Sequence, residues 1–74
     1  MKKIETFVPE EGDKLILIQS FTDLGLSKGD IVLYVNSISM GVICKKINTG
    51  EQCIVPYNAL KGIHCGNIVD LTFQ

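Results

Sequence analysis

Short apolar runs separated by turn residues are the feature of this chain that most restricts its fold. Isoleucine and valine together supply sixteen of the 74 residues, whereas alanine occurs once. Because β-branched side chains lose rotamer freedom in helices and pack well on a pleated surface, this composition favours strands. No segment sustains an apolar repeat at helical spacing, so the pattern is typical of a small sandwich or barrel.

The expected strands can be placed by residue range. The first is a short edge strand that stops before Pro9, and six further runs follow it. The seven ranges are 4–8, 14–20, 30–36, 40–47, 52–55, 61–65 and 68–73. Residues 57–60 predict one turn of 3-10 helix after Pro56. The last run alternates, which predicts a half-buried strand with one inward face formed by Val69, Leu71 and Phe73.

The size of the chain limits how these strands can assemble. Seventy-four residues leave room for one domain, spanning 1–74. Because an open sheet leaves aggregation-prone edges, we expect the strands to close on themselves. The sequence therefore predicts an all-β fold: a small barrel of five to six short strands with a 3-10 turn near residues 57–60.

Two stretches resemble the Src-homology-3-like barrels. The sequence LSKGDIV at 26–32 resembles the segment that follows their long first loop and enters the second strand. The sequence CIVPYNAL at 53–60 resembles the stretch that leads into their 3-10 turn. Members that bind proline-rich peptides use an aromatic groove with a Trp. This chain has no Trp and carries Ala59 at the place of a groove Tyr, so we do not expect it to bind such peptides.

A second family with this fold shares a shorter stretch. The sequence LGLSKG at 24–29 resembles a segment of the small accessory proteins of bacterial ferrous-iron transport, and 59–63 lies where their final turn and strand fall. Those proteins usually have a longer helical insert before the Leu-Gly pair, where this chain has the short stretch 20–23. The resemblance implies a cytosolic protein that binds a membrane transporter.

The charge composition bears on nucleic-acid binding. All seven cationic side chains are Lys, eight residues are acidic, and the formal net charge is −1. Arginine supplies the fork that grips phosphate and guanine edges, and general binding relies on phosphate neutralisation. We therefore expect no general nucleic-acid binding. A nucleic-acid-binding small barrel stays as an alternative, recognised by affinity that falls steeply with salt.

The location of the protein is predicted from two features of the sequence. No apolar stretch of signal-peptide length follows the basic start, and the apolar run at 15–18 is far too short to span a bilayer. Three cysteines, an odd number, fit a reducing compartment. We expect a cytoplasmic protein without membrane insertion.

Four residues have side chains of metal-ligand type, namely Cys44, Cys53, His64 and Cys65. They lack the closely spaced pairs of structural zinc sites, and adjacent residues 64 and 65 on one strand point to opposite faces. A two- or four-residue turn at 48–51 would make the first two cysteines diagonal neighbours on one face, whereas a three-residue turn would separate them. We predict buried free thiols and no metal or other cofactor.

Catalytic residues are not predicted. A cysteine nucleophile would need a neighbouring His with an orienting acid, and neither that arrangement nor a recognisable carboxylate pair is present in the sequence. We therefore expect a protein that is not an enzyme.

A surface for a partner protein is the remaining prediction. Tyr57 follows Pro56 at the expected lip of the barrel, and tyrosine is favoured at interfaces, whereas Tyr34 and Met40 are expected in the core. We predict a non-enzymatic interaction module of bacterial or phage type, such as an adaptor, inhibitor or regulatory subunit. Self-association through the C-terminal strand is a further possibility. The partner-binding lip is predicted to contain Asp23, Leu26, Lys28, Tyr57 and Asn58.

Overall fold

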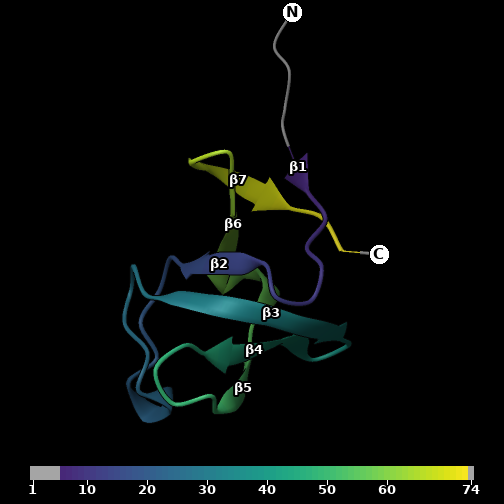
Figure 1. Cartoon of the computed structure of the whole chain (residues 1–74). Helices are drawn as coiled ribbons and strands as arrows, with labels where there is room; N and C mark the ends of the chain where they lie inside the picture. The colour runs from purple at the N-terminus through teal and green to yellow at the C-terminus, as the bar shows by residue number, and fades with distance from the viewer. Residues whose placement is uncertain (1–5, 74) are drawn as a thin grey trace, which may run out of the picture.

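One mixed β-sheet dominates the computed structural model, which describes residues 6–73 (Figure 1). Its strands are β1 (Thr6–Phe7), β2 (Lys14–Leu17), β3 (Ile31–Ile38), β4 (Gly41–Lys46), β5 (Gln52–Val55), β6 (Leu60–His64) and β7 (Asn67–Leu71). Two 3-10 helices complete the fold, η1 (Thr22–Leu24) and η2 (Tyr57–Ala59). The predictions of an all-β chain and of a 3-10 turn after Pro56 are confirmed.

The strand order across the sheet is β1-β7-β6-β2-β3-β4-β5. Neighbours are antiparallel except for β1 and β7, which are parallel. The two ends of this order, β1 and β5, do not pair with each other within residues 6–73, so the sheet is not closed. Within residues 6–73 it has seven strands where five or six were expected, because both β1 and β7 join the sheet.

Burial alternates along the central strands and defines one core face. Leu15 and Leu17 on β2 are fully buried, whereas Ile16 between them is half-buried on the opposite face. The core is formed by Leu15, Leu17, Leu26, Val32, Tyr34, Val42, Cys44, Val55, Ala59 and Leu60. Tyr34 belongs to it as expected, and its hydroxyl lies 3.1 Å from Ser37 Oγ.

The turn between β3 and β4 differs from the expectation. β3 continues through Ile38 after an irregularity in its pairing between Tyr34 and Asn36. Met40 therefore lies in the turn and is 72% exposed, so its predicted place in the core is wrong. Gly41 follows with a φ of 156° and begins β4.

The C-terminal hairpin confirms one prediction and corrects another. Leu71 and Phe73 pack against the core, as the alternation predicted, while Ile68 points outward with 59% exposure. The strand expected to reach Cys65 ends at His64. Cys65 has a φ of 53° and lies with Gly66 in the turn.

No helix within residues 6–73 is long and apolar enough to cross a membrane.

Candidate functional site

The segment between β2 and β3 is an ordered loop. Phe21 and Leu26 exchange two backbone hydrogen bonds of 2.8 and 3.0 Å, and the amide of Gly29 donates to the Leu17 carbonyl at 2.8 Å. The amide of Lys28 donates to Ser20 Oγ at 2.8 Å. Gly25, at a φ of 70°, ends η1 in the left-handed conformation that favours glycine. These bonds hold the loop in one shape beside the sheet.

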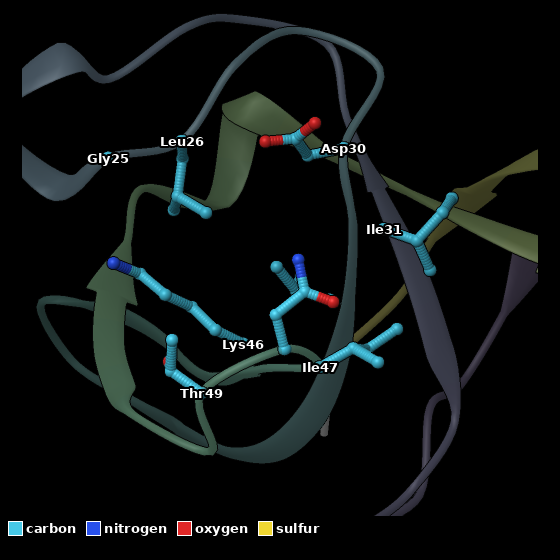
Figure 2. A pocket seen from close by; sticks show the side chains of 9 residues that line it. Gly25, Leu26, Asp30, Ile31, Lys46, Ile47 and Thr49 are labelled. Carbon is cyan, nitrogen blue, oxygen red and sulfur yellow. The ribbon is translucent and has the colours of Figure 1, made fainter.

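A first hollow of about 410 Å³ lies between this loop and the β4–β5 turn (Figure 2). Leu26, Ile31 and Ile47 contribute apolar surface to it, while Asp30, Lys46 and Thr49 contribute polar atoms. The Lys46 amine points toward the loop at Gly25, where a Cβ would lie 3.4 Å from Nζ. The lining is therefore a mixture of apolar and polar groups, as in surfaces that bind other proteins.

A second hollow of about 430 Å³ shares Lys46 with the first. Its other lining residues are Asp23, Leu24, Glu51, Gln52 and Cys53. Lys46 Nζ lies 3.6 Å from Glu51 Oε1, with the lysine side chain 23% exposed and the glutamate side chain 69% exposed. The half-buried amine therefore provides positive charge between two recesses with acidic groups at their margins.

The predicted lip is divided by the structure. Asp23 lines the second hollow and Leu26 the first, although Leu26 is buried. Lys28 lies exposed on the same loop. Tyr57 and Asn58 lie on η2 and line neither hollow.

The environment of Tyr57 shows where the second part of the lip lies. Its hydroxyl donates to the Ile38 carbonyl at the end of β3, and its ring packs edge-on against Phe73 with centroids 4.8 Å apart. These contacts fix the ring near the β3–β4 turn, although the residue is 37% exposed. Asn58 is exposed beside it.

Lys46 is the residue that sequence reasoning missed. The alternation of side chains along β4 indicates its position, because Val42 and Cys44 face the core and Lys46 is the next residue on the same face. Lys45 points to the opposite face and is exposed.

Cys44 and Cys53 are direct cross-strand partners on the core face. Neither predicted register is correct. The turn has four residues, but it spans 47–50, one residue earlier than expected, and the strands on either side of it begin with the pair Lys46 and Glu51. Burial raises the pKa of the Cys44 thiol to about 12, and the neighbouring Cys53 adds to the rise. Burial also raises the pKa of Cys53. No disulfide joins the two thiols; Cys44 is buried as predicted, whereas Cys53 is only half-buried.

The other two candidate metal ligands lie elsewhere. His64 stacks on Phe7 with ring centroids 5.2 Å apart, and Cys65 is exposed in the β6–β7 turn. Among residues 6–73, no group of three or more His, Cys, Asp or Glu side chains is arranged to hold a metal ion.

The Cys44 thiol predicts how stability depends on alkaline pH. The pKa is 9.0 without burial and about 12 in the fold, so the folded state keeps the proton longer. Stability from this group is therefore complete below pH 9 and falls between pH 9 and 12, by up to about 1.4 kcal/mol per pH unit. Urea unfolding of the wild type and Cys44→Ala across this range should show the variant losing less stability. Parallel pH profiles would contradict this assignment.

No protein-family model matches the chain, and no curated protein or solved structure is significantly similar to it. The two family resemblances therefore depend on the quoted segments alone.

Proposed function

We propose that this chain is a small non-enzymatic interaction module of the cytoplasm that binds a folded partner protein through the two hollows sharing Lys46. The observation that carries the proposal is the pairing of a hydrogen-bonded loop with two recesses around one half-buried amine. A fixed loop loses little conformational entropy on binding, and recesses lined by both apolar and polar groups suit a partner surface of mixed character. Tyr57 and Asn58 are proposed as a second contact.

The finer fold assignment is also a proposal. An ordered loop leads into β3, two hairpin connections follow through β4 and β5, and η2 comes before β6. This order of elements supports a Src-homology-3-like arrangement of β2 to β6, to which β1 and β7 are added. Fold alone does not fix function, so the interaction proposal depends on the hollows.

Removal of the Lys46 charge is expected to weaken partner binding. Lys46→Gln keeps a polar side chain, one atom shorter than lysine, and removes the charged amine between the hollows. Recovery of a stoichiometric partner from lysate of the source cell, measured by quantitative mass spectrometry on the tagged chain, should fall about tenfold, which corresponds to about 1.4 kcal/mol. The matched control is Lys45→Gln, which makes the same change one residue away on the opposite face.

Two results would contradict the proposal. One is the absence of any stoichiometric partner of the wild type, and the other is equal loss of recovery in both lysine variants. Recovery of the partner by Tyr57→Ala, measured in the same way, tests the proposed second contact at Tyr57 and Asn58. Unchanged recovery in that variant would remove η2 from the binding surface.

The identity of the recovered partner separates this proposal from its alternatives. A role in ferrous-iron transport requires the partner to be a membrane GTPase. Nucleic-acid binding requires a fluorescence titration in which affinity falls steeply as salt rises, and a flat response would remove that class.

A further inference from the structure

We propose that two copies of this chain pair along β5 and continue the sheet across a two-fold axis. This inference goes beyond the proposed function, although its surface meets the second hollow, because Gln52 and Cys53 of β5 also line that hollow. It starts from the backbone of β5, which pairs only with β4 within residues 6–73. Figure 1 shows β5 at the lower margin of the sheet, below β4.

The direction of the free backbone groups follows from the register. The Lys46 amide donates to the Glu51 carbonyl at 2.7 Å, so this pair is hydrogen-bonded. Hydrogen-bonded and non-hydrogen-bonded pairs alternate along an antiparallel ladder. Cys53 therefore bonds to β4, whereas Gln52 and Ile54 point their N–H and C=O groups away from it.

This edge lacks the usual protection against pairing. Natural edge strands are guarded by charged side chains, by proline within the strand, by bulges or by extreme shortness. The opposite edge, β1, has two residues, whereas β5 has four uncharged ones and its pairing with β4 is regular. Pro56, which has no amide hydrogen, lies after the end of β5, so the outward amides of Gln52 and Ile54 remain free to donate.

Exposed apolar side chains accompany the free edge. Ile54 is 42% exposed and lies directly opposite the half-buried Ile43 on the outer face. Met40 and Tyr57 lie beyond the far end of the β4–β5 ladder and are also exposed. A strand added beside β5 would cover part of this surface while it satisfies the backbone.

A second copy fits this edge because antiparallel pairing about a two-fold axis is self-complementary. With the axis at Cys53, each Gln52 faces Ile54 of the second copy, and each such pair exchanges two hydrogen bonds. No charged residue lies within Gln52–Val55, so the two strands do not repel each other. The outer faces of both sheets then continue into one another at Ile54.

This register places the two copies of Cys53 opposite each other in a non-hydrogen-bonded pair. Cα atoms in such pairs are about 4.5 Å apart, within the range of a disulfide. Cys44 and Cys53 within one chain form a hydrogen-bonded pair with Cα atoms about 5.5 Å apart, which is also within the range of a disulfide, so Cys44 must be removed in a test of the register. A disulfide between the two copies of Cys53 would therefore show that the two β5 strands pair in this register.

Sedimentation equilibrium of the full chain under reducing conditions tests the association. As concentration rises from low to high micromolar, we expect the average mass to move from 8.1 kDa toward twice that value. Ile54→Pro removes an outward amide without breaking a bond to β4, and Ile54→Lys places a charge at the new interface in both copies. Both variants should stay monomeric and keep the wild-type circular dichroism, while the matched control Ile68→Lys on β7 should still dimerise.

Oxidation tests the register separately. Diamide takes two electrons and two protons from two thiols and leaves a disulfide between them. In a background with Cys44→Ala and Cys65→Ser, a cross-linked dimer should form on a non-reducing gel and disappear when Cys53→Ser is added. A wild type that stays monomeric, or a dimer that survives both Ile54 variants, would overturn the proposal. A dimer without this cross-link would overturn the register centred on Cys53.

Discussion

Leu15→Ala is expected to lower the free energy of unfolding by about 2–5 kcal/mol. Leu15 is fully buried at the middle of β2, where it lies between Val32 on β3 and Gly62 on β6. Truncation removes its contacts on both sides, and the paired strands limit how far the core can collapse into the cavity. At roughly 0.05–0.15 kcal/mol per residue, a chain of 74 residues has about 4–11 kcal/mol in total. The variant should therefore lose roughly half of the stability of the fold.

Chemical unfolding followed by circular dichroism measures this effect, with Ile16→Ala as the matched control. Ile16 is the next residue on the same strand and is half-buried on the outer face. Its truncation should cost about 1 kcal/mol, the usual size for a partly exposed position. Equal losses in the two variants would show that the core face of β2 is assigned incorrectly.

Gly41→Ala is expected to destabilise the fold by about 3 kcal/mol or more. A Cβ at this position would lie 2.6 Å from the carbonyl oxygen of Val55 and 3.2 Å from its carbonyl carbon. The clash is with backbone that is fixed by the pairing of Val42 with Val55, so it cannot be relieved by rotation of a side chain. The φ of 156° adds a conformational cost for any L-residue with a side chain.

Gly50→Ala is the matched control that shows the cost of a positive φ without a steric clash. Gly50 has a φ of 77°, but nothing lies within 4 Å of an added Cβ. Its replacement should cost about 1–2 kcal/mol, which is the left-handed penalty alone. Thermal and urea unfolding of both variants give the comparison. A Gly41→Ala variant no less stable than Gly50→Ala would contradict the close approach of β4 and β5 at this point.

The local features of the fold were predictable because they are encoded by neighbouring residues. Alternation gave the inward face of β7, and Pro56 marked the end of β5 before η2. The β4–β5 register was not predictable, since it depends on which residues close the turn. A shift of one residue in the turn changed the relation of Cys44 and Cys53 from diagonal to direct.

The candidate site was only partly predictable for a different reason. The predicted lip residues Asp23 and Leu26 line the two hollows, whereas Lys46, which lines both, was not predicted and comes from a distant strand. Only the packing of the loop against the β4–β5 turn brings these groups together. Tyr57 was predicted beside the loop residues, but its hydrogen bond to the Ile38 carbonyl fixes it near the β3–β4 turn. Long-range packing of this kind has no signal in a single sequence.

The most direct test of the interaction proposal is amide chemical-shift mapping of the labelled chain with its recovered partner. The account predicts that the largest changes fall on both sides of Lys46, on the loop at 23–26 and on the turn at 47–49. Changes at Tyr57 and Asn58 would add η2 to the interface. Changes confined to other surfaces, such as the β6–β7 hairpin, with the two hollows unaffected, would contradict the proposed binding site.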